Sequence, residues 1–164
     1  MDPLEIKKYP EKVLRKKSKL LVEVTAEEKA LFEQMLFTMK YFSGIGLAAP
    51  QIGILKEMIV AEVDRDIIRL ANPEVIDIED SDQMVEGCLS IPDVSVDIER
   101  PYKVTLKGLN EDGKIIEVKA EGLLARVLLH EIDHLKGKLI IDYMPLSDIL
   151  RFAKKRRSGK HANL

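Results

Sequence analysis

The sequence His130-Glu131-Ile132-Asp133-His134 places two imidazoles and a carboxylate within five consecutive residues. On an α-helix, residues four apart lie one turn apart on the same face, so the two histidines can bind one metal ion. Glu131 lies beside the first histidine and can take a proton from a water molecule that the ion acidifies. The pattern therefore predicts metal-assisted hydrolysis, whereas a helix with two surface histidines is the simpler structural alternative.

A catalytic metal site needs a third protein ligand and an open position. Downstream of the motif, Asp142 and Asp148 are candidates, since no glutamate follows and the remaining histidine, His161, lies near the terminus. Upstream lies Cys88, the single cysteine of the chain. A lone cysteine is more often a small buried apolar residue than a ligand. Because two histidines need a further ligand, we favour Cys88 and predict a Cys-His-His site.

Two helices are predicted from capping signals and apolar periodicity. Thr25 and Glu28 form a capping box, and apolar residues at helical spacing follow, so we expect a helix over about 26–42. A second helix over about 123–136 should end at Gly137. This second helix would carry both histidines of the motif.

The middle of the chain is rich in β-branched and aliphatic runs. Strands are predicted over residues 58–63, 67–71, 75–78, 94–98, 102–109 and 114–120. The turn sequence at 110–113 predicts a hairpin between the last two. A short strand at 139–141 and a helix capped by Ser147, reaching about Arg157, should complete the chain. Strands concentrated between helices predict an α+β fold with mostly antiparallel sheet.

Length and composition limit the class of protein. The 164 residues fit one domain, and 46% hydrophobic with 33% charged residues is an ordinary globular balance. The net charge of −2 argues against a general polyanion binder. One cysteine excludes an internal disulfide and indicates a reducing compartment. No apolar run approaches the roughly 20 residues that cross a bilayer, so we expect a cytoplasmic protein without a membrane partner.

Three segments together resemble the peptide deformylases, the enzymes that remove the formyl group from N-formylmethionine on new bacterial polypeptides. They are Gly-Ile-Gly-Leu-Ala-Ala-Pro-Gln at 44–51, Glu-Gly-Cys-Leu-Ser at 86–90, and the His-Glu motif at 130–134. Their order and separations match the family over nearly the whole chain. The resemblance implies one catalytic domain over 1–164, with mostly antiparallel sheets around a central helix that carries the motif, an N-terminal helix and a C-terminal helix.

The resemblance also implies the residues of the reaction. It assigns three metal ligands, Cys88, His130 and His134. Glu131 would be the general base and then the acid, while Gln51 and the backbone N–H of Leu89 would face the formyl oxygen. The implied ion is Fe(II), although imidazole and thiolate also suit Zn, Ni or Co. The products would be formate and a free N-terminal methionine.

By the same resemblance, five residues line the pocket for the methionine side chain: Ile45, Gly46, Met84, Leu123 and Val127. The apolar residues among them could equally be ordinary residues of the hydrophobic core. Leu123, Val127 and His130 do fall on one helical face, at spacings of four and three. This spacing predicts that the pocket wall lies beside the metal.

Glu86 and Arg100 match charged family positions and are implied to form a buried pair that fixes the metal loop; a surface pair is the alternative. Leu129 stands where many family members have Gln, which predicts altered hydrogen bonding around the ligands rather than lost function. The C-terminal segment, about 147–164, carries a run of basic residues without an acidic one, Arg151, Lys154, Lys155, Arg156, Arg157 and Lys160. Such a run is usually a solvated helix end, but the resemblance implies contact with ribosomal RNA.

Two other classes of function remain as alternatives. A different His-Glu-x-x-His metallohydrolase, such as a small peptidase, predicts a carboxylate as the third ligand. A metal-binding or RNA-binding module without enzymatic activity would need neither Glu131 nor Gln51, and it would have a closed site with four ligands. The resemblance favours the deformylase, with nascent N-formylmethionyl peptides as its substrate.

Overall fold

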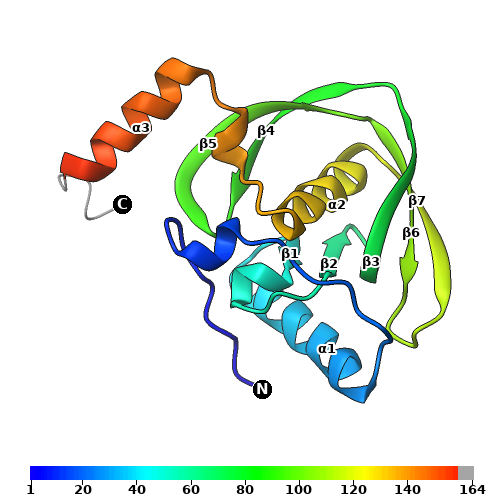
Figure 1. Cartoon of the computed structure of the whole chain (residues 1–164). Helices are drawn as coiled ribbons and strands as arrows, with labels where there is room; N and C mark the ends of the chain where they lie inside the picture. The colour runs from blue at the N-terminus through cyan, green and yellow to red at the C-terminus, as the bar shows by residue number, and fades with distance from the viewer. Residues whose placement is uncertain (159–164) are drawn as a thin grey trace.

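The computed structural model describes the backbone of residues 1–158 and the side chains of residues 1–152. The described chain has the α+β architecture expected from the sequence, with antiparallel sheets (Figure 1). Its α-helices are α1 (Ala26–Tyr41), α2 (Gly122–Leu135) and α3 (Leu146–Ser158). Short 3-10 helices are η1 (Lys12–Arg15), η2 (Ala49–Ile52) and η3 (Ile140–Tyr143). None of the described helices is long and apolar enough to cross a membrane.

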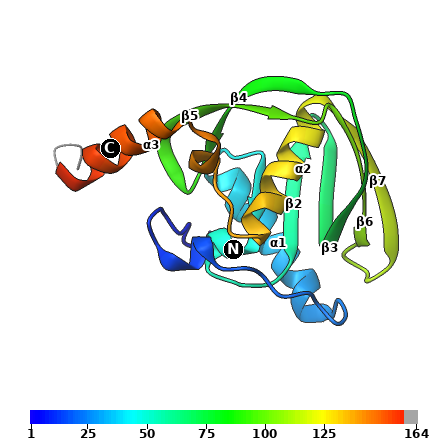
Figure 2. The same ribbon diagram turned by 45° about the horizontal axis from the view of Figure 1, so that its top comes forward.

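The strands form two separate antiparallel sheets. One has five strands in the order β1-β2-β3-β6-β7, and the other is the two-stranded hairpin β4–β5. The bounds are β1 (Gly46–Ala48), β2 (Met58–Val63), β3 (Asp66–Glu79), β4 (Asp82–Cys88), β5 (Ile91–Arg100), β6 (Lys103–Leu109) and β7 (Ile115–Glu121). Figures 1 and 2 show α2 lying between the five-stranded sheet and the β4–β5 hairpin, which arches over it.

The helix α1 begins at the predicted capping box, in which Thr25 and Glu28 each bond the other's backbone. The Glu28 carboxylate also pairs with Lys56, Oε2 to Nζ at 2.7 Å. Hydrogen bonds from Lys56 and Thr25 lower the pKa of Glu28 to about 2. Buried side chains on one side of the helix, such as Phe32 and Met39, pack into a core cluster with residues of β1 and β2.

The helix α2 packs its apolar side on the five-stranded sheet. Leu128 and Ile132 lie in a buried cluster with strand residues that include Ile59 and Leu106, and Leu129 packs against the same cluster. Apolar contact of this kind is non-directional and follows the area removed from water. It fixes the helix on the sheet and leaves the opposite side of α2 to other partners.

Gly137 ends α2 as predicted. Its φ of +75° is the left-handed conformation that favours glycine just beyond a helix. A Cβ atom at this position would lie 2.4 Å from the carbonyl oxygen of Arg15. The glycine therefore allows both the helix stop and the close approach of the N-terminal segment.

The β4–β5 hairpin has its own apolar cluster. Ile91, Val96 and Ile98 of β5 pack there against Leu14 and residues 139–141. The two sheets share no strand pairing among the described residues. The strand β4 itself was not predicted, because its sequence, Asp-Gln-Met-Val-Glu-Gly-Cys, has few β-branched residues and contains a glycine next to its last residue.

The predicted strands 67–71 and 75–78 are one continuous strand, β3, so the predicted break was wrong. Asn72 takes a φ of +50° and the register to β6 shifts between Ala71 and Glu74, which marks a bulge rather than a turn. The Asn72 side chain exchanges hydrogen bonds with the backbone of Leu21, at 2.8 and 2.9 Å. Tertiary contacts therefore hold the bulge within the strand.

The predicted strand at 139–141 was also wrong, because this segment leads into the 3-10 helix η3. Leu139, Ile140 and Ile141 are all buried, and the Asp142 carboxylate accepts from the Leu139 N–H at 2.9 Å, which closes a turn. A run of three buried apolar residues does not by itself distinguish a strand from a helical turn.

The prediction that Ser147 caps the last helix was wrong. The helix α3 already begins at Leu146, and the carbonyl of Pro145 accepts from the N–H groups of Asp148 and Ile149. Figures 1 and 2 show α3 projecting from the body of the molecule. Its described contact with the N-terminal segment is between the rings of Phe152 and Tyr9, whose centroids are 5.7 Å apart.

Candidate metal centre

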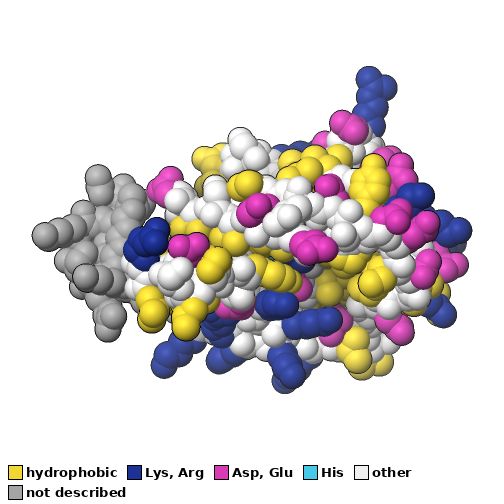
Figure 3. Space-filling model, turned by 90° about the horizontal axis from the view of Figure 1, so that it is seen from above, with side chains coloured by type: hydrophobic (Ala, Val, Ile, Leu, Met, Phe, Trp, Pro, Cys, Tyr) yellow, Lys and Arg dark blue, Asp and Glu magenta, His cyan; other side chains and the backbone are white. Residues whose placement is uncertain are grey.

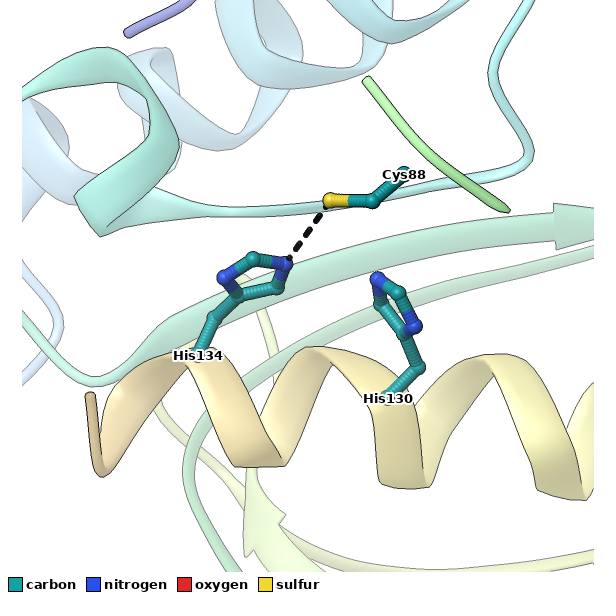
Figure 4. A group of neighbouring side chains, drawn as sticks. All are labelled: Cys88, His130 and His134. Atoms are coloured by element: carbon teal, nitrogen blue, oxygen red, sulfur yellow. Dashed lines mark hydrogen bonds between the residues drawn. The ribbon is translucent and has the colours of Figure 1, made fainter. Parts of the chain in front are cut away.

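Cys88, His130 and His134 come together between β4 and α2. One potential ligand atom from each, a thiol sulfur and two ring nitrogens, lies within 4.8 Å of the others. The Cys88 Sγ is 3.4 Å from Nε2 of His134, and both histidines rise from adjacent turns of α2 toward the cysteine (Figure 4). The structure thus assembles the three residues that the sequence had selected, one from a strand end and two from a helix.

The downstream carboxylates do not join this group. Asp142 is held by Arg15, whose two terminal nitrogens reach its oxygens at 2.6 and 3.0 Å. Asp148 lies on α3 beside Arg151. The geometry therefore provides no support for the carboxylate third ligand that the peptidase alternative requires.

Glu131 is buried beside the three residues. Its side chain lines the same cavity, and its Oε1 has no hydrogen-bond partner among the described residues. Burial raises the pKa of Glu131 to about 7, because a charged carboxylate loses its hydration there. Such a group can both accept and return a proton near neutral pH.

Gly46 on β1 explains how Glu131 reaches this position. A Cβ atom on residue 46 would lie 2.4 Å from Glu131 Oε2 and 2.6 Å from Val127 Cγ1. Both contacts are closer than real Cβ atoms tolerate, so any larger residue would displace the strand or the carboxylate. The absence of a side chain at residue 46 thus makes room for Glu131.

The Gln51 side chain is buried and fixed from two sides. Its Oε1 accepts from the N–H of Ala48 at 2.9 Å, which sets the orientation of the amide. Its Nε2 donates to Ser90 Oγ at 3.1 Å and lies 3.7 Å from Cys88 Sγ. The amide nitrogen therefore points toward the cysteine and its cavity.

Leu89 lies in the tight turn that joins β4 to β5, since Cys88 pairs directly with Ile91. The hydrogen bond that closes a two-residue turn joins the flanking residues, so the N–H of the first turn residue is available to a ligand. Ser90, the other turn residue, is fully buried and receives the Gln51 amide. Sequence reasoning did not single out Ser90, although it belongs to the second motif.

A cavity of about 470 Å³ opens beside these groups. Its wall contains all five residues predicted for the side-chain pocket, Ile45, Gly46, Met84, Leu123 and Val127, together with Gln51, Cys88, Leu89, His130 and Glu131. In Figure 3, which views the molecule from above, no histidine is visible among the described side chains. Both imidazoles are largely buried, with His134 1% exposed and the His130 side chain 11% exposed.

Glu86 and Arg100 form the buried pair that the sequence suggested, and the surface alternative is wrong. Arg100 donates from Nε and Nη2 to Glu86 at 2.5 and 2.9 Å, and both side chains are at least 94% buried. Glu86 Oε1 also meets His130 Nδ1 at 2.9 Å. Burial alone would raise the pKa of Glu86, but hydrogen bonds from His130 and Arg100 lower it to about 2.

Three further residues of this network were missed from the sequence. Arg126 donates to Glu86 Oε2 at 2.6 Å. Asp133 accepts from Arg100 at 3.0 Å and from the Tyr143 hydroxyl at 2.6 Å. A signal for Arg126 was present, because this cation interrupts the otherwise apolar stretch 123–129 that precedes His130.

The donor set fits a late transition metal. A thiolate and two imidazoles are the ligands that zinc, iron, cobalt and nickel accept. Burial lowers the pKa of His134 well below its usual value, which favours the neutral imidazole that binds metals. With Glu131 beside them in one cavity, these groups define a candidate metallohydrolase centre.

Comparison with known proteins gives the family. The family model described as polypeptide deformylase matches residues 3–148. A peptide deformylase of Thermodesulfovibrio yellowstonii is 47% identical over 163 residues, which cover 96% of this chain and 98% of that relative. A peptide deformylase structure from Legionella pneumophila superposes with a TM-score of 0.90 at 34% identity, covering 99% of this chain and 98% of that one. The corresponding structure from Thermotoga maritima gives 0.83 at 38% identity, covering 87% and 97%.

The chain therefore belongs to the polypeptide deformylase family, and it is an enzyme of the deformylase class.

Proposed function

We propose that this deformylase removes the formyl group from N-formylmethionyl nascent peptides in a reaction that depends on one divalent metal ion. The whole chain, 1–164, would form one catalytic domain that works in the cytoplasm, with α2 as its central helix. The observation that carries the proposal is the convergence of Cys88, His130 and His134 within 4.8 Å, beside a buried carboxylate. Family membership indicates the deformylase reaction, and this cluster offers the metal ligands and the carboxylate that such a reaction needs.

The ion would be held by Cys88, His130 and His134. A bound divalent ion of this kind supplies Lewis-acid polarisation and lowers the pKa of a water molecule. Fe(II) is the proposed native ion, and Zn, Ni or Co could replace it, because the same ligands suit each of them. Metal analysis of protein purified without oxygen tests this identity, and protein that holds one of the other metals in place of iron as purified would contradict it.

The chain's own groups carry the protons and hold the developing charge. Glu131 accepts a proton from the attacking water, since it is buried in the cavity wall with Oε1 unpaired among the described residues. Gln51 Nε2 and the Leu89 N–H donate to the formyl oxygen as it becomes negatively charged. Glu131 then returns the proton to the departing nitrogen, and formate and a free N-terminus leave.

The cavity suits an apolar side chain at the substrate's N-terminus. Ile45, Met84 and Leu123 in its wall are partly exposed apolar residues, which a bound methionine would remove from water. The strand β1 lies at one edge of the five-stranded sheet. An extended peptide can hydrogen-bond along such an edge, which supports a linear peptide substrate.

Formate release from formyl-Met-Ala-Ser is the direct test. We expect rapid release, and the acetylated peptide, which differs by one methyl group on the carbonyl carbon, serves as the matched control. The Cys88→Ala variant separates this proposal from the peptidase alternative. Loss of metal and of formate release supports the proposed site, whereas retained metal together with peptidase activity would contradict it.

The same proposal includes a ribosome contact through the basic C-terminal segment. The projecting position of α3 supports it (Figure 1), as does the run of basic residues from Arg151 onward. The side chains of Lys154, Lys155, Arg156 and Arg157, and all of Lys160, lie outside the described residues. A variant that lacks the segment should lose co-sedimentation with ribosomes at low salt, and unchanged co-sedimentation would refute the contact.

A further inference from the structure

Arg126 is a buried cation that the proposed reaction does not use. It lies on α2 four residues before His130, and its side chain is 5% exposed. Nη1 donates to Glu86 Oε2 at 2.6 Å and to the carbonyl of Ile98 at 2.8 Å. Nη2 donates to the carbonyl of Asp82 at 2.8 Å. One guanidinium thus joins α2 to three points on the β4–β5 hairpin.

The contact with Glu86 links Arg126 to the metal centre. Glu86 Oε2 binds Arg126, while Oε1 meets His130 Nδ1 at 2.9 Å. Residues four apart lie on the same face of a helix, so α2 presents both partners side by side to one carboxylate. With Nδ1 of His130 engaged in this way, Nε2 is the nitrogen that remains for an ion.

The hairpin has few other described contacts with α2 or with the five-stranded sheet. It shares no strand pairing with the five-stranded sheet among the described residues. Its apolar cluster packs against Leu14 and residues 139–141, and this described cluster includes no residue of α2. Toward α2, the described contacts are between charged or polar groups, including Arg100 with Asp133 at 3.0 Å. The distance between hairpin and helix therefore depends on directional bonds.

We propose that Arg126 is a positioning residue that fixes the Cys88 hairpin against the helix carrying the two histidines. This inference rests on the proposed function, since it presumes that the three residues bind an ion. A guanidinium suits the role because it is always charged and offers several donors in one rigid plane. An apolar residue of similar volume could fill the space but could not hold two backbone carbonyls and a carboxylate.

The test compares cobalt binding by the full-length protein and two variants. Each is loaded with Co(II) alone, and the release rate into excess chelator and the visible absorption spectrum are recorded. Arg126→Met should release cobalt about tenfold faster or more, as is typical when a group supporting a metal ligand is lost. Its visible bands should also shift, because the thiolate and imidazoles no longer meet the ion in the same geometry.

Arg126→Lys keeps the positive charge but loses the planar group, so we expect release several-fold faster than in the parent. This variant also carries the test if Arg126→Met does not fold. Release at the parent rate with an unchanged spectrum in Arg126→Lys would overturn the proposal, because charge alone would then suffice. Release at the parent rate in Arg126→Met, with only a lower melting temperature, would also overturn it.

Arg15→Met is the matched control. Arg15 likewise contacts a carboxylate with two nitrogens, Asp142 at 2.6 and 3.0 Å, and a backbone carbonyl, that of Gly137 at 3.3 Å. Among the described residues Arg15 makes no hydrogen bond to a metal ligand, so Arg15→Met should release cobalt within about twofold of the parent rate. If the parent itself binds no cobalt, the proposed metal site fails, and that outcome is distinct from equal release by parent and variants.

Discussion

The helix α2 meets its two neighbours through surfaces of opposite character. Toward the five-stranded sheet it presents Leu128 and Ile132, which are buried among apolar strand residues. Toward the β4–β5 hairpin it presents Arg126, His130 and Asp133, which bond charged side chains and backbone carbonyls. The helix is therefore fixed to one sheet by apolar area and to the other by directional bonds.

This difference separates two properties of the molecule. Apolar burial sets the free energy of unfolding and tolerates small displacements. Hydrogen-bonded ion pairs contribute less net stability, because the charges lose hydration, but they specify distances and angles. We therefore expect substitutions on the sheet side of α2 to change stability, and those on the hairpin side to change the metal centre.

The largest effect is expected at Glu131, which lies where the two regions meet. Glu131→Gln preserves the shape of the side chain but removes the proton acceptor. Turnover should fall by about 10²–10⁴-fold, while metal content and melting temperature stay close to those of the parent. Glu62→Gln, on a strand glutamate paired with Lys40, is the control. Substantial formate release by Glu131→Gln would remove its assigned role.

A core substitution on the sheet side should act on stability alone. Leu128 is fully buried, so Leu128→Ala should lower the free energy of unfolding by about 2–5 kcal/mol in urea titrations. Metal release from the folded protein should not change. Ile98→Ala removes a similarly buried side chain from the hairpin. It should accelerate metal release, because Cys88 packs against the cluster to which Ile98 belongs. Equal metal release rates in the two variants would contradict the view that the sheet side governs stability and the hairpin side governs the metal centre.

The ion network between α2 and the β4–β5 hairpin makes the free energy of unfolding depend on pH. Because the pKa of Glu86 is lowered to about 2, the ionised carboxylate stabilises the folded state. The contribution of Glu86 to the free energy of unfolding is fully present above about pH 5 and is lost as the pH falls toward 2. In urea titrations of metal-free protein, Glu86→Gln should flatten the decline over this window. The same slope in parent and variant would contradict the pKa shift.

The smallest effect on stability is expected at the start of α1, which belongs to neither of the two surfaces of α2. Thr25→Ala removes the cap of α1, and it should lower the free energy of unfolding by about 1 kcal/mol. Cobalt release and formate release should match those of the parent. A changed release rate in this variant would mean that stability and the metal centre are not separable.

Local patterns predicted the helices and most strands. The capping box at Thr25 and the glycine at residue 137 give the start of α1 and the end of α2, because both signals act within one turn of the chain. The predictions failed where distant contacts decide the conformation. Asn72 keeps β3 continuous by bonding Leu21, and η3 is closed by an Asp142 that Arg15 also holds.

The same limit applies to the site. The pair His130 and His134 follows from helical spacing, whereas Cys88 needed a chemical argument and the family resemblance. The sequence contains no signal that Gln51 is anchored by Ser90, thirty-nine residues away. Nor does helical spacing alone show that Arg126 would meet Glu86, since that contact depends on how the hairpin lies across α2.

The split origin of the three ligands gives an ion at this site a second role as a cross-link. Cys88 and His134 are 46 residues apart in sequence. One belongs to a hairpin that, among the described residues, pairs with no strand of the other sheet, and the other belongs to α2. An ion bound by both closes that stretch of chain into a loop, which restricts the unfolded state as a covalent bridge would. Thermal unfolding should then depend on chelator concentration, and backbone amides of β4 and β5 should exchange with solvent faster once the ion is removed.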